Sequence, residues 1–368
     1  MKRVFWADEI PTNENVQHFG TNPDSDRYTY NYCPSVMEEE DGTIHMYYCT
    51  NQGESSRFNM VFIDYIGYRT GTPKGDGTYT WSDETIVLSP AEDSNVWDSK
   101  HVCDPSVVKG SFNYNGENYQ YLMSYLGCMV TDLNNDGIDD DFNDIGLAVA
   151  NKPAGPWVKI GTTPFIDYVY DETSSNNWGV GQPSLVNKGG ADSGDIWFFY
   201  TRGDKESTRV IVCDADFSDL NNPVLRTSVK LRNNGLVLTT TGKDSIINNA
   251  DFAYDDARGV LYAVSGCQPR PSTAPNYIAD QFRVTSFRFG GTDIQELNDN
   301  NSSAGRWKYL ATVGKDDTGF ARNHNTALLR DEYGHTDSNI LTAFYSVSIE
   351  TSSVAERYYR IHSMSFVK

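Results

Sequence analysis

Residues 104–108 of this chain read DPSVV, and this short stretch decides the fold because the chain repeats it. Residues 33–37 read CPSVM and residues 182–186 read QPSLV, so a Pro-Ser pair opens the same kind of apolar run three times. A polar turn follows each copy, and an aromatic-rich run comes next, such as DIWFFYT at residues 195–201. Short apolar and aromatic runs bounded by turn residues are typical of β-strands, so each copy predicts a pair of adjacent strands.

Two more divergent copies extend the series to five. They are NADFAY at residues 249–254 and NHNTALL at residues 323–329. Successive copies start about 70 residues apart, and a third and often a fourth strand-like run follows each one. Four strands repeated five times predict an all-β fold, a five-bladed β-propeller of four-stranded blades. Two separate β-sandwiches are the alternative, but sandwiches would not place a Pro-Ser pair at the start of three consecutive units.

The repeats also predict how the domain is organised. We expect residues 1–368 to form a single propeller, with blades starting near residues 31, 102, 180, 248 and 322. Propellers avoid an open sheet edge by joining their first and last strands. The N-terminal run at residues 3–7 should therefore pair with the last strand-like run, residues 358–366.

The composition argues against several classes of partner. Acidic residues number 50 and basic residues 30, which gives a net charge of −20, so nucleic acid and anionic membrane surfaces are not expected partners. No apolar run reaches about 18 residues, the length that a membrane-spanning helix needs. The first residues, MKRVFWADEI, contain no apolar signal segment. We therefore expect a cytoplasmic protein, or a periplasmic or secreted one if a signal was removed, and its oligomeric state stays open.

The six cysteines form no metal-binding or redox spacing. They stand at positions 33, 49, 103, 128, 213 and 267, without any CxxC pair. Most lie inside strand-like apolar runs, so we expect them to be free, buried and inert.

The propeller fold brings the starts of the five repeats together. In a propeller the first strand of each blade lines the central channel, and residues at its start meet at one mouth of that channel. The expected meeting residues, one from each repeat, are Cys33, Asp104, Gln182, Asp251 and His324.

Three segments carry a resemblance to a known group of enzymes: WDSKHVCDPS at residues 97–106, IGLAVANKPAGPW at residues 145–157 and GVGQPSL at residues 179–185. With the repeats, they resemble the five-bladed propeller glycosidases, that is, glycoside hydrolase family 43 and its relatives in families 32, 68 and 117. The resemblance implies a carbohydrate-active enzyme, a glycoside hydrolase that acts on a poly- or oligosaccharide in the channel pocket.

The chain departs from the three carboxylates of such glycosidases, which are an Asp in each of the first two blades and a Glu in the third. Asp104 matches the second of them. The first position is Cys33, or is shifted within Asn31 and Tyr32, and the third is Gln182, which cannot donate a catalytic proton. Asp251 and His324 could supply the missing acid and base, and family 117 is thought to use a histidine as acid. We also expect His101 to keep Asp104 ionised near neutral pH.

Three alternatives to this assignment stay open. Loop residues could supply the carboxylates instead, and the candidates are Asp24, Asp26, Asp171 and Glu172. The propeller could also bind sugar without cleaving it. A third possibility is a metal-dependent sugar deacetylase, because a propeller deacetylase of N-acetylgalactosamine resembles the segment around His101. On a straight strand, however, His101 and Asp104 would point to opposite faces unless a bulge lies between them.

Further residues are expected to contact the sugar. A Trp ring can stack on the apolar face of a sugar, and His, Gln and Asn side chains can hydrogen-bond its hydroxyl groups. The expected contacts are His101, Gln182, Trp178, Asn31 and Asn325.

The sequence DLNNDGIDDD at residues 132–141 predicts a calcium loop. Its oxygen ligands Asp132, Asn134, Asp136 and Asp140 fall at positions 1, 3, 5 and 9, with a glycine at position 6. Position 12 is Asn143 rather than Glu, so the loop is closer to those of dockerins and thrombospondin repeats. We expect a structural Ca²⁺ here; the alternative is a solvated acidic turn.

Overall fold

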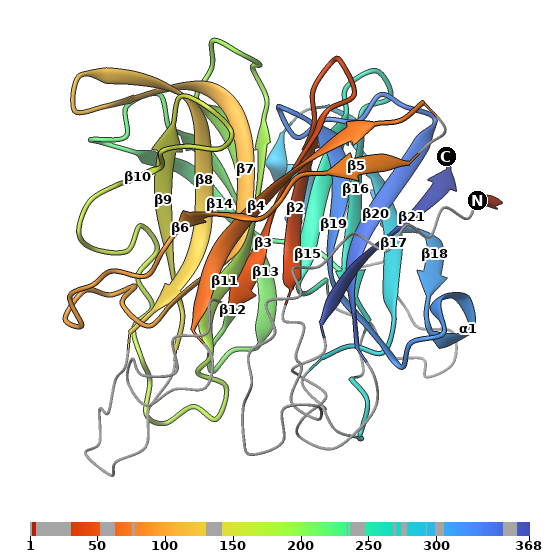
Figure 1. Cartoon of the computed structure of the whole chain (residues 1–368). Helices are drawn as coiled ribbons and strands as arrows, with labels where there is room; N and C mark the ends of the chain where they lie inside the picture. Colours follow the sequence, from red (N-terminus) through yellow and green to blue (C-terminus); the bar gives the residue numbers. More distant parts are fainter. Residues whose placement is uncertain are drawn as a thin grey trace, which may run out of the picture.

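The computed structural model describes residues 2–4, 31–51, 63–75, 78–129, 142–233, 235, 247–267, 270–273, 278–291, 293–298, 305–348 and 359–368. These residues lie mainly in β-strands that stand side by side (Figure 1). Two short helical turns are also present, the 3₁₀ turn η2 (Ile294–Leu297) and α1 (Lys315–Thr318). No helix in the described part of the chain has the length and apolar character needed to cross a membrane.

Three blades are separate four-stranded antiparallel sheets in which strands adjacent in sequence are adjacent in space. The second blade consists of β7 (His101–Tyr114), β8 (Glu117–Cys128), β9 (Asp144–Ala150) and β10 (Val158–Lys159). The third consists of β11 (Gly179–Asn187), β12 (Asp195–Gly203), β13 (Thr208–Asp216) and β14 (Val224–Lys230). The fourth consists of β15 (Ala250–Asp255), β16 (Val260–Gly266), β17 (Phe282–Arg288) and β18 (Lys308–Val313).

The first and last blades are joined to each other. The first consists of β2 (Tyr32–Glu38), β3 (Ile44–Asn51) and β4 (Asp64–Pro73), with β5 (Tyr79–Trp81) and β6 (Thr85–Leu88) both paired to β4. The fifth consists of β19 (Arg322–Asp331), β20 (Ile340–Ser348), β21 (Arg360–Val367) and the N-terminal β1 (Lys2–Val4). β1 runs antiparallel to β21, and β2 pairs in parallel with β19. The ring is therefore closed by the N-terminal strand, and the predicted all-β, five-bladed propeller is confirmed.

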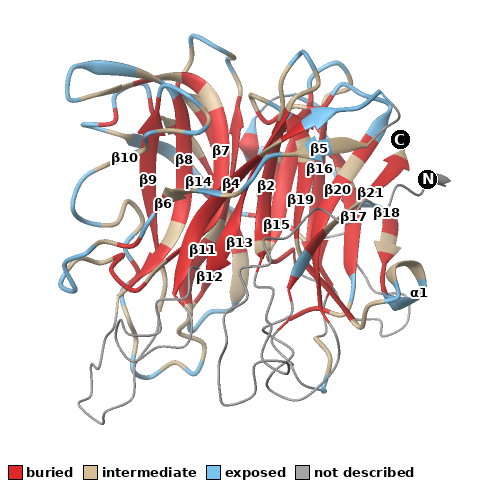
Figure 2. Ribbon diagram, in the orientation of Figure 1, coloured by how far each residue is buried: buried red, intermediate tan, exposed pale blue. Residues whose placement is uncertain are grey.

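Apolar side chains fill the spaces between neighbouring blades. Between the third and fourth blades, Phe199 stacks on Phe252 with ring centroids 4.1 Å apart, and Trp197 lies 5.0 Å from Tyr254. Comparable clusters join the other pairs of neighbouring blades. Burying one such aromatic side chain contributes about 1.5–3 kcal/mol. Figure 2 shows the result, with buried residues along most of the strands and exposed residues mainly in the connecting loops.

Candidate functional site

Each blade has one residue with a left-handed backbone at the start of its innermost strand. The φ angles of these residues lie between 46° and 51°, and the residues are Cys33, Asp104, Gln182, Asn249 and Asn325. In four of the blades the strand pairing also shifts register at this point, as in a β-bulge. A non-glycine residue in this conformation costs about 1–2 kcal/mol, and such strain is concentrated at functional sites. The five residues therefore mark one end of the channel as the candidate site.

In the first four blades, the position two residues after the left-handed residue explains the repeated Pro-Ser pair, whereas the fifth blade has Ala327 at this position. In those four blades, a side-chain oxygen at this position accepts a hydrogen bond from a backbone N–H of the next blade. The observed bonds are Ser35 from Val107 (3.3 Å), Ser106 from Leu185 (3.0 Å), Ser184 from Phe252 (3.1 Å) and Asp251 from Leu328 (2.8 Å). The motif thus links innermost strands around the channel.

The expected position of Asp251 needs a correction. Asp251 occupies the serine position of the motif, and the left-handed residue of its blade is Asn249. Its second carboxylate oxygen accepts a 2.6 Å hydrogen bond from Ser184 and lies 3.2 Å from Nη1 of the buried Arg330. Side chains two positions apart point to the same face of a strand, so the alternation of the sequence does not reveal a shift of two residues.

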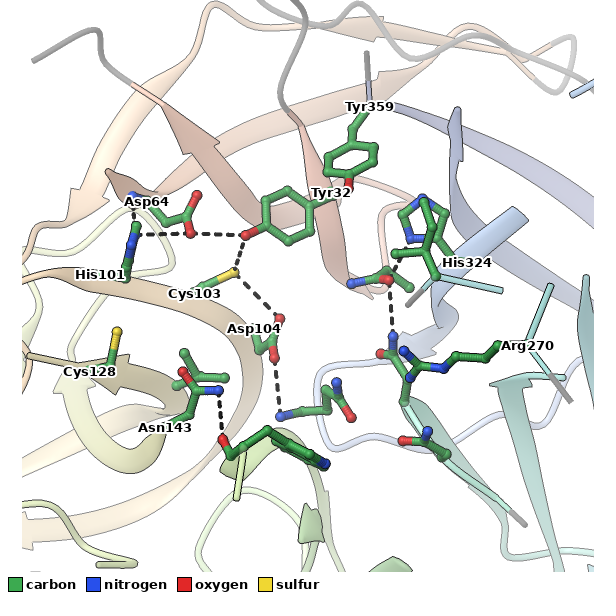
Figure 3. Close-up of a pocket in the computed structure, with 17 residues that line it drawn as sticks. Tyr32, Asp64, His101, Cys103, Asp104, Cys128, Asn143, Arg270, His324 and Tyr359 are labelled. Atoms are coloured by element: carbon green, nitrogen blue, oxygen red, sulfur yellow. Dashed lines mark hydrogen bonds and ion pairs between the residues drawn. The ribbon is translucent and has the colours of Figure 1, made fainter. Parts of the chain in front are cut away.

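The main pocket lies at the channel mouth, where the left-handed residues are found, and has a volume of about 620 Å³ (Figure 3). All five blades contribute to its lining. Of the predicted site residues, Asp104, His324, His101, Gln182, Trp178 and Asn325 line this pocket. Asn31 does not line it: its buried amide donates a 3.1 Å hydrogen bond to Thr50 Oγ1, so its position does not fit the expected contact with substrate.

Asp104 is a buried carboxyl group in this pocket, and 9% of the residue is exposed. Burial raises its pKa to about 6, and the negative charge of Asp64 acts in the same direction. Hydrogen bonds from the Cys33 thiol and from the backbone N–H of Gln182, which lies 3.2 Å from Oδ2, act in the opposite direction. Asp104 therefore exchanges its proton near neutral pH, as a general acid or base must.

His101 does not stabilise the charge of Asp104 as expected, because it is paired with a different carboxylate. Its Nδ1 lies 3.2 Å from Asp64 Oδ2, and the backbone N–H of Asp64 donates to the same nitrogen at 2.9 Å. Tyr32 donates its hydroxyl proton to Asp64 Oδ2 at 2.9 Å. Asp64 was not predicted from the sequence, because the repeats mark the innermost strands and Asp64 opens β4, the third strand of its blade. The signal available in the sequence was an acidic residue directly before an aromatic-rich strand.

His324 lies on another wall of the pocket and is 1% exposed. Its Nδ1 lies 2.6 Å from Asn325 Oδ1, which also accepts a 3.0 Å bond from Asn249. Because an amide oxygen only accepts, the proton of neutral His324 is on Nδ1. Burial, together with the positive charges of Arg270 and Arg322, lowers its pKa to about 4. His324 is thus neutral at pH 7 and its proton is directed at Asn325, a geometry that fits a positioning residue better than the predicted acid.

Trp178 and Gln182 belong to the third-blade side of the pocket. Trp178 is half-buried, and its Nε1 donates to Thr208 Oγ1 at 3.3 Å. A Cβ atom on Gly203 would lie 1.8 Å from that nitrogen, so only glycine allows the indole to lie against β12. Gln182 lines the pocket, and its buried Oε1 has no hydrogen-bond partner among the described residues. Both side chains therefore form part of the pocket wall on the third-blade side.

The expectation that all cysteines are free is wrong for two of them. Cys49 and Cys103 form a disulfide that joins β3 of the first blade to β7 of the second, next to Asp104. The other four, Cys33, Cys128, Cys213 and Cys267, are free and buried, as predicted. The spacing of cysteines in the sequence cannot reveal a pair that only the packing of two blades brings together.

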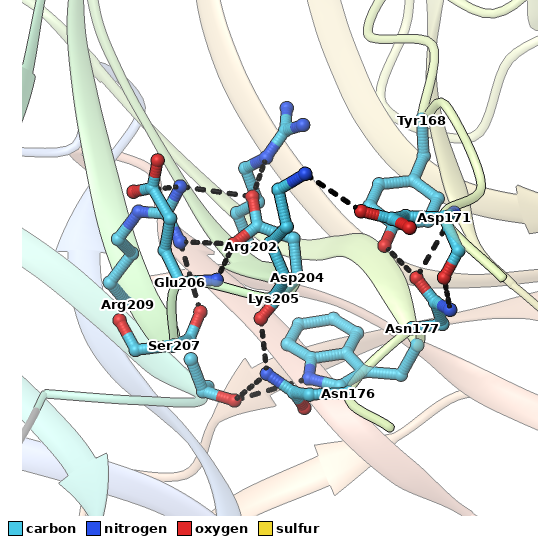
Figure 4. A network of polar contacts seen from close by, with 12 residues as sticks. Tyr168, Asp171, Asn176, Asn177, Arg202, Asp204, Lys205, Glu206, Ser207 and Arg209 are labelled. Atoms are coloured by element: carbon cyan, nitrogen blue, oxygen red, sulfur yellow. Dashed lines mark hydrogen bonds and ion pairs between the residues drawn. The ribbon is translucent and has the colours of Figure 1, made fainter. Parts of the chain in front are cut away.

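The loop alternatives fall into two groups. Asp171 lines a separate cavity of about 800 Å³ and pairs with Lys205 at 2.9 Å, in a network with Arg202, Asp204 and Arg209 (Figure 4). Glu172 lines the same cavity, so neither carboxylate belongs to the pocket of Asp104. Asp24, Asp26 and the predicted calcium ligands Asp132, Asn134, Asp136 and Asp140 lie outside the described residues.

The sequence matches no known family profile and no curated protein. Solved structures do match its fold. A family 117 glycoside hydrolase from the marine bacterium Zobellia galactanivorans has a TM-score of 0.59 at 13% identity, over 99% of this chain and 90% of that chain. An N-acetylgalactosamine deacetylase from F. plautii has a TM-score of 0.55 at 13% identity, over 98% and 95%. An alpha-L-arabinofuranosidase from Lactobacillus brevis has a TM-score of 0.54 at 10% identity, over 91% and 90%. The chain therefore shares the propeller fold that its sequence resembles.

Proposed function

We propose that the protein is a glycoside hydrolase that cleaves a poly- or oligosaccharide in the pocket at the channel mouth. One observation carries this proposal: two carboxyl groups, Asp104 and Asp64, line one pocket in different surroundings. Burial raises the pKa of Asp104 to about 6, whereas Asp64 accepts a hydrogen bond from Tyr32 and lies beside His101. Glycoside hydrolysis needs a carboxyl group that keeps its proton and a second one that is ionised.

The surroundings of each group suggest its role. Asp104 is the general acid, because its raised pKa leaves a protonated fraction near pH 6. Asp64 is the partner carboxylate, since the hydroxyl of Tyr32 donates a hydrogen bond to its Oδ2. His101 keeps 16% of its side chain exposed and orients Asp64 from the pocket rim. Trp178 offers a stacking surface for a sugar ring, and Gln182 offers hydrogen bonds to its hydroxyl groups.

The test is a screen of the purified protein against aryl-glycosides and plant or algal oligosaccharides. We expect release of new reducing ends, and we expect Asp104→Asn and Asp64→Asn each to lower turnover by at least about 100-fold. Binding of an identified sugar without any turnover would instead favour a propeller that binds carbohydrate and does not cleave it.

A sugar deacetylase is the second candidate. The N-acetylgalactosamine deacetylase shares the fold over 98% of this chain, and Asp64, His101 and Asp104 offer oxygen and nitrogen atoms in one pocket. One observation counts against this candidate. Among the described residues, the potential metal ligands whose atoms lie within 4.8 Å of one another are Cys33, Cys49, Cys103 and Asp104, and two of these sulfurs are already joined in the disulfide. Release of acetate from N-acetylated sugars that stops on chelation would support the deacetylase.

We also propose a structural calcium ion in the loop at residues 132–141. The spacing of its acidic residues supports the ion, and Asn143, at position 12 of the loop pattern, lines the pocket. The side-chain amide of Asn143 donates a 3.0 Å hydrogen bond to the carbonyl oxygen of Trp178. An ordered loop would therefore steady the part of the pocket wall that carries Trp178.

A further inference from the structure

Arg270 is a positively charged side chain in a pocket whose acidic groups lie elsewhere. It follows β16 and lines the main pocket. Among the described residues, no other Arg or Lys lines this pocket. No described residue forms an ion pair or a hydrogen bond with its side chain. Burial lowers its pKa, and no carboxylate of the described residues opposes that effect. A partly buried charge without a partner is costly, so a partner from outside the chain would stabilise it.

The segment that carries Arg270 is anchored to the fifth blade. Arg322, at the start of β19, donates to both the backbone oxygen and the hydroxyl of Thr273, each at 3.0 Å. Arg270 and His324 both line the pocket, and the positive charge of Arg270 contributes to lowering the pKa of His324. His324 is neutral at pH 7 and therefore cannot neutralise a ligand or repel one by charge. The backbone segment that carries Arg270 is thus anchored to the fifth blade beside the pocket.

The pocket is therefore divided by charge. Asp64 and Asp104 lie with His101 and Tyr32 on one side, and Arg270 lies with His324 on the other (Figure 3). In a protein with a net charge of −20, a cation in the pocket that no described residue neutralises is the feature that attracts an anionic group. Guanidinium groups bind carboxylate and sulfate oxygens through two parallel N–H donors.

We infer that the sugar bound in this pocket carries an anionic substituent, a carboxylate or a sulfate ester, and that Arg270 selects it. This inference rests on the proposed carbohydrate function and adds its substrate class. With the anion on Arg270, the glycosidic bond of the same sugar extends toward Asp104 and Asp64. The selection acts on binding and needs no covalent step.

The test measures binding of matched monosaccharide pairs by calorimetry, so that it does not depend on hydrolysis. The pairs are galacturonate with galactose, glucuronate with glucose, and galactose 6-sulfate with galactose; the first two probe a carboxylate and the third probes a sulfate. We expect at least one acidic sugar to bind about 10-fold more tightly than its neutral partner, with a preference that weakens as salt is added. Arg270→Gln should abolish this preference and leave binding of the neutral sugar within about twofold. Arg270→Lys, which keeps the charge but loses the paired donors, should retain part of the preference.

The matched control is Arg306→Gln, which removes the same charge from an exposed position outside the pocket and should keep the preference. Equal binding of acidic and neutral sugars by the wild-type protein, or a preference that persists in Arg270→Gln, would overturn the inference. Hydrolysis of neutral glycosides with equal binding of each pair would overturn it while the proposed function stands. An Arg270-dependent preference without any hydrolysis would support it and count against the proposed function alone.

Discussion

Replacement of Asp104 by asparagine should change activity and stability in opposite directions. The substitution keeps the shape of the side chain and its capacity to accept the hydrogen bond from the Gln182 backbone N–H, but it removes the charge and the proton. If Asp104 is the general acid, turnover should fall by at least about 100-fold. The folded protein should nevertheless gain stability at neutral pH, because the buried negative charge is gone.

The size of that gain follows from the pKa of Asp104, which burial raises from the ordinary value of 3.8 to about 6. In this interval the folded protein holds the proton more tightly than the unfolded chain does. Below pH 3.8 the protonated Asp104 contributes its full stabilisation to the folded protein, and this contribution is lost as the pH rises through 6. A shift of this size corresponds to about 3 kcal/mol. Asp104→Asn should therefore unfold with a free energy about 3 kcal/mol higher than that of the wild-type protein at pH 8, and the difference should shrink toward zero near pH 4.

The assay is urea denaturation of both proteins at pH 4, 6 and 8, followed by fluorescence of the tryptophans. Asn118→Ala, an exposed substitution in the β7–β8 hairpin, serves as a control that should show no such dependence on pH. In activity measurements, wild-type kcat should fall as the pH rises above about 6, since the acid form is then lost. A difference in unfolding free energy that is the same at pH 4 and pH 8 would refute the assigned burial of the Asp104 charge.

Three further predictions can be checked separately. Chelation with excess EGTA should lower the Tm, because removing a ligand present at about 100 times its Kd costs the native state about 2.7 kcal/mol; an unchanged melting curve in protein shown to be free of metal would count against calcium. Deletion of residues 1–8 should lower the Tm, since it removes β1 and leaves the edge of β21 unpaired; a truncated protein that melts like the parent would mean that closure adds little. Ser184→Ala should destabilise the protein by about 1–3 kcal/mol in urea denaturation, because it removes a donor to Asp251 and leaves the Phe252 N–H without its acceptor, whereas Ser207→Ala on the surface should not.

The architecture is encoded locally in the chain. Five copies of one local pattern were enough to predict five blades, because hydrophobic alternation and turn residues act within one strand pair and need no distant contact. The same repeats located Asp104, Gln182, His324 and Asn325 at the channel mouth. Equivalent positions of the blades lie at the same distance from the propeller axis and at the same height along it. The Pro-Ser pair was visible as a repeat, although its role in linking one blade to the next was not.

The composition of the pocket, in contrast, depends on tertiary contacts. Asp64 comes from a third strand and Arg270 from a connecting segment, so neither belongs to the repeat that marked the innermost strands. The disulfide between Cys49 and Cys103 and the pairing of His101 with Asp64 join residues dozens of positions apart, and no local pattern records such contacts. The pKa values of Asp104 and His324 depend on how deeply the assembled blades bury them. Periodicity in the sequence reports which face of a strand a residue occupies, whereas the neighbours of that face are set by the path of the whole chain.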